Sequence, residues 1–427
     1  MTVAIVGGGF AGLLVAARLI ASGVDDVVVL EASEHPGGVA RSVSRDGYIL
    51  EPGAGSFTLP HPHLSALLDG RGIQPAAATA RMRHIWTGDR LITPRSGPAA
   101  VLAPLVSPRA KLRGAFEFLV AEPPEEYDES LDTFLRRRLG NDLGRMAAWL
   151  AASGVFAGDP ARLSAHAAFP ALTDLVDSHG SIMAGMRARF RSQGSSARSV
   201  HVPLTTMSDL AGQIAESLGG RFKPGVTVNA VRREGHRWII DGSERREADH
   251  VVLATDPEVA ANLVTGPLAE ALRGSSAAPV VVVGLGGPDL DVPDGFGILT
   301  GPDAGMATRG VLLESSYAPH RAPDGHGLVK VIACASPQLL ATDDSTVVDH
   351  VGAEVARIFG ADLDVTFTEV VRHRRGIPQY EVGHRRWLAS VDEATPESLH
   401  LAGWGYRGVG IAHLATDAFR IAAHITA

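Results

Sequence analysis

A glycine-rich run lies near the start of the chain. Residues 7–12 read Gly-Gly-Gly-Phe-Ala-Gly, a G-x-G-x-x-G spacing between a predicted strand, residues 2–6, and an apolar helix, residues 13–20. Glycines at this spacing permit a tight turn, a close approach of the backbone to a pyrophosphate and close packing of the helix on the strand. The helix N-terminus then faces the phosphate charge. The residues predicted to make this contact are Gly7, Gly8, Gly9, Phe10, Ala11 and Gly12.

An acidic residue completes the pattern. The second strand, residues 27–30, ends at Glu31, about 20 residues after the glycines, where a carboxylate accepts hydrogen bonds from a ribose. A Gly-rich turn of another α/β protein would explain the glycines, because the chain has 48 of them, but not the strand, helix and acid together. The pattern therefore predicts a dinucleotide-binding βαβ unit that ends at about Ala32.

Glycine-rich stretches recur at residues 37–41, 53–56 and 403–411. The last of them precedes a predicted helix over residues 412–424. If that helix begins at Ala412, the amides of Gly410 and Ile411 and the positive end of the helix dipole would stabilise negative charge on a bound group. A glycine-rich cap or loop without a ligand is the other interpretation.

The remaining elements predict a mixed α/β fold in which a Rossmann-like domain is interleaved with a second domain. Helices are predicted over residues 130–139, 142–152, 181–190 and 206–218, a hairpin over 226–231 and 238–240, and strands over 249–257, 280–285 and 328–334. We assign residues 1–73, 201–275 and 371–427 to the nucleotide-binding domain, residues 74–200 to a helical subdomain, and residues 276–370 to the sheet of a substrate domain.

Composition argues against several kinds of partner. A net charge of −8 disfavours nucleic acid. The single Cys334 allows neither an internal disulfide nor a Cys-rich metal cluster, and no other residues have the spacing of metal ligands, so no metal is predicted. Because the first predicted strand begins at residue 2, we expect no signal peptide, and no apolar run reaches the roughly 18 residues of a membrane span. We expect a cytoplasmic protein whose helical subdomain could meet a membrane surface or a second subunit.

Four separated motifs resemble the flavin-containing amine oxidase superfamily. They are the glycine motif with Glu31, the Gly37–Gly38 pair with Arg41, the strand at 249–257 and the closing segment 403–411. Within that superfamily, residues 154–160, 169–170 with 179–181, and 377–384 are similar to protoporphyrinogen and coproporphyrinogen oxidases. The most specific match is 377–384, Ile-Pro-Gln-Tyr-Glu-Val-Gly-His.

The resemblance implies an FAD-dependent oxidase or dehydrogenase in which hydride passes from a cyclic organic substrate to flavin N5. It places the pyrophosphate on residues 7–12, the adenosine ribose on Glu31 and the adenine against Val228. Because only one dinucleotide fingerprint is present, oxygen or a quinone-like acceptor would reoxidise the flavin. The remaining ribityl and flavin contacts implied are Val39, Arg41, Gly53, Ala54, Gly55, Ser56, Val409, Gly410 and Ile411.

The residues that would act on the substrate are less defined. A porphyrinogen oxidase needs mainly an apolar cavity with cations placed for the propionates. Arg83 resembles the family's substrate-carboxylate arginine, although a surface arginine at a strand edge explains it equally well. A lone histidine is more often structural, so His166, His179 and His384 are not assigned as a base.

Two other functions fit the same motifs. An amine oxidase or desaturase acting on a different small molecule is disfavoured, because that branch often carries a lysine on the strand that here reads Ala-Pro-Val-Val-Val-Val at 278–283. A non-redox relative that binds a prenyl group or a partner protein is disfavoured by FAD motifs at both ends of the chain. Departures from the family pattern at 201–206 and 412–413 leave the tetrapyrrole substrate open.

Overall fold

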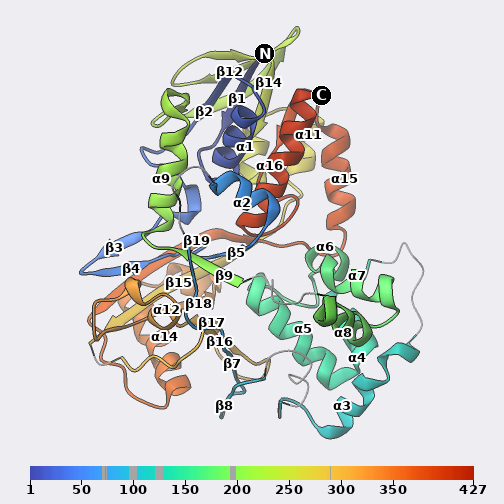
Figure 1. Cartoon of the computed structure of the whole chain (residues 1–427), viewed down its shortest axis with the longest axis vertical. Helices are drawn as coiled ribbons and strands as arrows, with labels where there is room; N and C mark the ends of the chain where they lie inside the picture. The colour runs from blue at the N-terminus through green and yellow to red at the C-terminus, as the bar shows by residue number, and fades with distance from the viewer. Residues whose placement is uncertain (70–72, 74, 96–102, 121–127, 193–198, 289) are drawn as a thin grey trace.

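The computed structural model describes residues 1–69, 73, 75–95, 103–120, 128–192, 199–288 and 290–427. Figure 1 shows three groups of elements: a sheet with its helices at the top, near both termini, a second sheet at the lower left, and a group of helices at the lower right. The mixed α/β class predicted from the sequence is confirmed.

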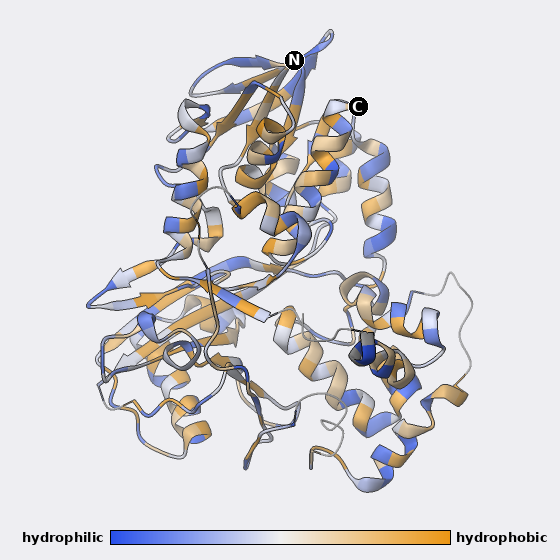
Figure 2. Cartoon of the chain, in the orientation of Figure 1, coloured by the Kyte–Doolittle hydropathy of each residue, from blue (hydrophilic) through white to orange (hydrophobic). Residues whose placement is uncertain are grey.

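The upper group is built on a parallel sheet with the strand order β10-β2-β1-β14-β20. Its central strands are buried on both faces, which is why their sequences are continuous apolar runs. In Figure 2 these strands are largely hydrophobic, whereas α15 at the right edge is mostly hydrophilic. The strands come from distant parts of the chain, so the Rossmann-like sheet is interleaved: β1 (Thr2–Val6), β2 (Asp26–Leu30), β10 (Phe222–Lys223), β14 (His250–Leu253) and β20 (Leu399–Leu401).

Helices cover both faces of this sheet. On one face α1 (Phe10–Ala21), α2 (Pro62–Leu68), α9 (Met207–Ser217) and α16 (Ile411–Thr426) share one apolar core. A capping box between Thr206 and Asp209 sets the start of α9. On the other face lie α10 (Pro257–Leu263), α11 (Pro267–Leu272), α15 (His384–Ala394) and a small sheet with the predicted hairpin: β11 (Val228–Glu234), β12 (Arg237–Gly242) and β13 (Arg246–Ala248). The short η4 (Gly219–Arg221) leads into β10.

The second sheet has the order β19-β15-β18-β17-β16-β7-β8 among the described residues and is largely antiparallel. Helix α14 (Asp344–Phe359) packs on it through Val347, Val351 and Val355. Its strands are β7 (Arg83–Trp86), β8 (Leu91–Ile92), β15 (Ala277–Gly287), β16 (Gly297–Thr300), β17 (Thr308–Leu312), β18 (Gly327–Cys334) and β19 (Phe367–Pro378). Two short elements, η1 (Gly38–Ala40) and β5 (Phe57–Leu59), contribute Ala40 and Phe57 to the core of the first sheet. The other short elements are β3 (Val43–Arg45), β4 (Tyr48–Leu50), β6 (Pro75–Ala77), β9 (Ser199–Pro203), α12 (Glu314–Tyr317), η5 (Pro319–Arg321) and α13 (Pro337–Ala341).

The helical group forms a core of its own around Leu131, Phe134 and Phe156. It leaves Leu112, Phe116 and Leu119 exposed. No helix in the described ranges combines the length and apolarity that crossing a bilayer requires. The elements are α3 (Pro108–Ala115), η3 (Glu117–Leu119), α4 (Leu131–Leu139), α5 (Asn141–Val155), α6 (Ala165–Ala168), α7 (Pro170–His179) and α8 (Ile182–Ser192).

The predicted domain boundaries stay a prediction. Gln74, the first residue of the predicted helical subdomain, lies outside the described residues. Two strands run across the other boundaries: β9 spans the junction at 200/201 and β19 the junction at 370/371.

Candidate active site

The turn between β1 and α1 brings backbone amides to a cavity of about 260 Å³. An added Cβ at Gly12 would lie 2.0 Å from Gly7 O, so glycine is required where the helix packs on the turn. At Gly9 the nearest atom to such a Cβ is Gly38 Cα at 3.8 Å, which leaves the cavity side open. Gly9 caps α1 without a side-chain hydrogen bond, so the first amides of α1 are available to an anion.

Glu31 lines the same cavity. Its Oε2 accepts a hydrogen bond from Gly8 N at 2.6 Å and its Oε1 accepts one from Ser33 N at 2.9 Å. These bonds fix the carboxylate beside the glycine turn. Glu31 thus lies beside the glycine turn, and its contact with a ribose stays a prediction.

The closing segment reaches the cavity from the other end of the chain. Helix α16 begins at Ile411, one residue before the predicted start, because Gly410 (φ 110°) is its N-cap. The cap has no side-chain hydrogen bond, and a Cβ added to Gly410 would meet no described atom within 4 Å. Two helix N-termini whose N-cap glycines offer no side-chain hydrogen bond, those of α1 and α16, thus face one cavity.

A buried ionic cluster holds the loop 51–56 that borders this cavity. Lys330 Nζ donates to Glu51 O at 2.8 Å, and Arg321 Nη2 donates to Gly55 O at 2.5 Å. Both cations form ion pairs with Glu314. Burial alone would raise the pKa of Glu314, but the Arg321 and Lys330 charges outweigh it and lower that pKa. Glu51 is different: burial raises its pKa despite the hydrogen bond from Ser42.

The structure collects many of the predicted contact residues in this small cavity. The predicted residues that line it are Gly7, Gly9, Phe10, Ala11, Glu31, Val39, Ala54, Gly410 and Ile411. It is also lined by Thr255, Asp256, Arg375 and Trp404, which the sequence reasoning did not select. Trp404 lies inside the closing segment. Asp256 lies in the 249–257 segment, which was predicted as one strand; the strand ends at Leu253, because Asp256 already caps α10.

The other predicted contacts lie nearby but do not line it. Gly8, Gly12, Gly53 and Gly55 pack behind it, where an added Cβ would collide with neighbouring atoms. Ser56 and Val409 line a neighbouring cavity of about 300 Å³. Arg41 lines a polar groove beside α9, Ala32 is exposed, and Val228 begins β11. Their contacts with a cofactor stay predictions.

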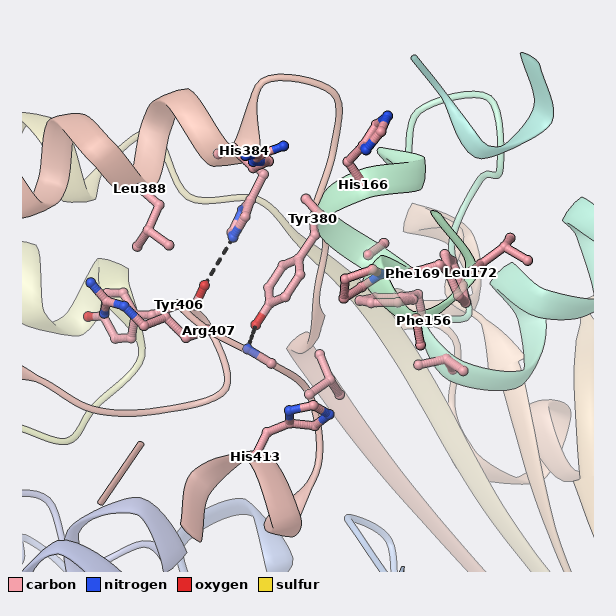
Figure 3. A pocket seen from close by; sticks show the side chains of 18 of the residues that line it. Phe156, His166, Phe169, Leu172, Tyr380, His384, Leu388, Tyr406, Arg407 and His413 are labelled. Carbon is pink, nitrogen blue, oxygen red and sulfur yellow. Dashed lines mark hydrogen bonds between the residues drawn. The ribbon is translucent and has the colours of Figure 1, made fainter. Parts of the chain in front are cut away.

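A larger cavity of about 910 Å³ lies on the other side of the 408–411 loop. Figure 3 shows aromatic side chains from the helical group, Phe156 and Phe169, opposite Tyr380 and His384. Its charged rim is cationic: Arg189, Arg385 and Arg407 line it, and none of the described lining residues is Asp or Glu. Val409 lines both this cavity and the 300 Å³ cavity, which also contains Gly410.

The histidines and Arg83 are separated by the fold. His166 and His384 line the large cavity, and burial lowers the pKa of His384, so its ring is neutral at neutral pH. His179 ends α7 and does not line that cavity. Arg83 is exposed on β7, where its guanidinium lies 5.5 Å from the Phe296 ring, and it does not line the cavity either. Its role as a carboxylate ligand stays a prediction.

These features define the site of a flavoprotein oxidoreductase. The N-terminus of α1 fits the pyrophosphate of FAD, and the N-terminus of α16 fits its flavin. The carboxylate of Glu31 fits its ribose. The chain belongs to the flavin-containing amine oxidoreductase family, whose model matches residues 10–425. It is an FAD-dependent oxidoreductase.

Characterised relatives of similar sequence are porphyrinogen oxidases. The chloroplastic protoporphyrinogen oxidase of Nicotiana tabacum is 26% identical, over 99% of this chain and 85% of that protein. The coproporphyrinogen III oxidase of Bacillus subtilis (strain 168) is 24% identical, over 96% of this chain and 94% of that protein. A crystal structure from Exiguobacterium sp. 255-15, of a protein assigned as a protoporphyrinogen oxidase, has a TM-score of 0.84 at 22% identity and covers 99% of this chain and 98% of that one. At this identity, the likeness to the Exiguobacterium structure shows the fold alone.

Proposed function

We propose that this protein oxidises a porphyrinogen, using bound FAD as the hydride acceptor. The carrying observation is the 910 Å³ cavity, whose walls are apolar and aromatic and whose charged lining residues are all cationic. A tetrapyrrole macrocycle with propionate groups has the matching chemistry: a broad apolar ring with carboxylates at its edge. FAD, when bound, supplies the redox chemistry, and the protein contributes positioning and electrostatics.

The cavity and the FAD site share a wall. Residues 408–411 border the large cavity through Val409 and the small one through Gly410 and Ile411. A substrate in the large cavity therefore lies next to the loop that borders the cofactor site. The chain's own residues would orient the substrate: the aromatic walls hold the ring, and Arg385 holds a carboxylate, whereas Arg407 is already paired with Asp392.

The cationic rim of the large cavity also disfavours an amine substrate. A protonated amine would meet Arg385 and Arg407 and no described acidic lining residue, so its desolvation would be uncompensated. Oxygen or a quinone-like compound is the proposed acceptor. Contact with a membrane surface or a second subunit remains a prediction.

The test uses the purified, FAD-loaded protein. It is mixed aerobically with coproporphyrinogen III or protoporphyrinogen IX, and porphyrin fluorescence is followed against the non-enzymatic rate. We expect an accelerated rise with at least one of them. Repeating the assay without oxygen, with and without menadione, identifies the acceptor. If the flavin absorbance stays oxidised after anaerobic mixing with both porphyrinogens, the proposed substrate class is wrong.

A further inference from the structure

The hydroxyl of Tyr380 bridges two backbone groups of the closing segment. It donates a hydrogen bond to Trp404 O at 2.5 Å and accepts one from Gly408 N at 2.6 Å. The side chain is 4% exposed, and burial raises its pKa well above the usual value, so the hydroxyl keeps its proton. The Tyr380 hydroxyl thus makes one hydrogen bond as a donor and one as an acceptor, both to the loop between Trp404 and Gly408.

The Tyr380 ring is held from the substrate side. The His384 ring stacks on it at 4.0 Å between centroids and 18° between planes, and Phe156 of the helical group lies 5.7 Å away. His384 also contacts the loop, with Nε2 3.0 Å from Tyr406 O. The Tyr380 carbonyl accepts a hydrogen bond from Ser164 N at 2.8 Å. Figure 3 shows the Tyr380 ring in the wall of the large cavity with its hydroxyl directed at the loop.

The segment that Tyr380 holds leads directly to the start of α16. Gly408 (φ 132°) is closely packed, since an added Cβ would lie 2.6 Å from the His413 ring. Two residues later Gly410 caps α16, and Trp404, Gly410 and Ile411 line the FAD-binding cavity. A change in the position of Gly408 would therefore displace the amides that face the cofactor.

We propose that Tyr380 is a positioning residue, which fixes the flavin-facing segment 404–410 from the substrate cavity and so sets the affinity and redox potential of the bound FAD. The proposal explains why the 377–384 stretch is a distinctive part of the sequence: it connects the helical group to the closing segment. It rests on FAD binding and does not depend on the porphyrinogen.

The test is the variant Tyr380→Phe, which keeps the ring and removes both hydrogen bonds. Apo-protein is titrated with FAD, and the midpoint potential of the reconstituted flavin is measured. We expect the dissociation constant of FAD to rise at least about tenfold, since losing even one of the two buried hydrogen bonds has an effect of this order. The midpoint potential becomes more negative, because the helix terminus is less well placed to stabilise negative charge.

A matched control separates positioning from general destabilisation. Tyr48 is also buried, its hydroxyl lies 2.6 Å from His326 Nδ1, and neither residue lines the 910 Å³ or the 260 Å³ cavity. Tyr48→Phe should lower the melting temperature to a similar extent while leaving FAD affinity and potential unchanged. His384→Leu removes the ring stacked on Tyr380 but keeps the Tyr380 hydroxyl, and it should shift the FAD dissociation constant and the midpoint potential in the same direction as Tyr380→Phe. It replaces Tyr380→Phe in the test if Tyr380→Phe does not fold. Wild-type FAD affinity and potential in a folded Tyr380→Phe or His384→Leu variant would overturn the proposal.

Discussion

The structural role of Lys330 could not be predicted from the sequence. It lies on β18 opposite Gly284 of β15, the strand whose lack of lysine disfavoured an ordinary amine oxidase. Its ammonium is buried and points to the carbonyl of Glu51 and the carboxylate of Glu314. The ammonium of Lys330 therefore holds the loop 51–56. Within this loop Gly55 has no room for a side chain, since an added Cβ would lie 2.9 Å from Glu51 Cβ.

Lys330→Met should destabilise the protein by about 3 kcal/mol, because removing one partner leaves buried groups uncompensated. Denaturant unfolding of the two proteins measures the difference. Arg145→Met is the contrasting control, since its pair with Asp303 is exposed and should contribute less than about 1 kcal/mol. Equal losses in the two variants would contradict the interpretation of the Lys330 cluster as a buried anchor.

At the scale of elements, the pairing of β14 with β20 creates a pH-sensitive contact. His250 and His400 stack with 5.5 Å between ring centroids, and their Nδ1 and Nε2 atoms lie 3.3 Å apart. Burial, together with positive charge from His250, Arg420 and His424, lowers the pKa of His400 to about 4. Burial also lowers the pKa of His250.

A lowered histidine pKa means that the folded protein binds fewer protons than the unfolded chain. The stability from neutral His400 is complete above the unfolded value of 6.5 and is lost as the pH falls towards 4. We expect a loss of about 2 kcal/mol between pH 7 and pH 5 that is absent in His400→Gln. Urea unfolding at both pH values tests this. An identical pH dependence in the variant would assign the effect to other groups.

At the scale of the whole molecule, each of the two cavities is formed between groups of elements: Arg375 of β19 joins the small cavity beside the first sheet, and the helical group lines the large one. The large one takes Phe156 and Phe169 from the helical group, Arg385 from α15 and Val409 from the closing segment. The sequence-predicted carboxylate ligand, Arg83, lies instead on β7 of the larger sheet. The fold thus offers two candidate positions for the carboxylates of a substrate.

Two variants decide between those positions. Arg385→Ala should raise the KM for coproporphyrinogen III about tenfold and leave FAD content unchanged, because a carboxylate loses its charged hydrogen-bond partner. Arg83→Ala should raise the KM less if the large cavity holds the substrate. Steady-state kinetics on both purified variants provide the comparison. The reverse order of effects would move the substrate carboxylates to the β7 edge.

The sequence by itself determined the parts of the fold that depend on local patterns. The β1–α1 turn, Glu31 after β2 and the buried β14 strand follow from glycine spacing and apolar periodicity, although β14 covers only His250–Leu253 of the predicted 249–257. The start of α16 was predicted one residue late, because Gly410 is the cap and Ile411 already has helical geometry.

Only the tertiary structure decided which distant residues meet. Tyr380 contacts Trp404 and Gly408, Lys330 contacts Glu51, and Arg385 joins the large cavity across long separations in the chain. Side-chain hydrogen bonds and buried ion pairs of this kind have no periodicity in sequence, because they depend on how whole layers of strands and helices pack. For that reason the glycine turn and the acid beside it could be predicted from the sequence, whereas the large cavity could not.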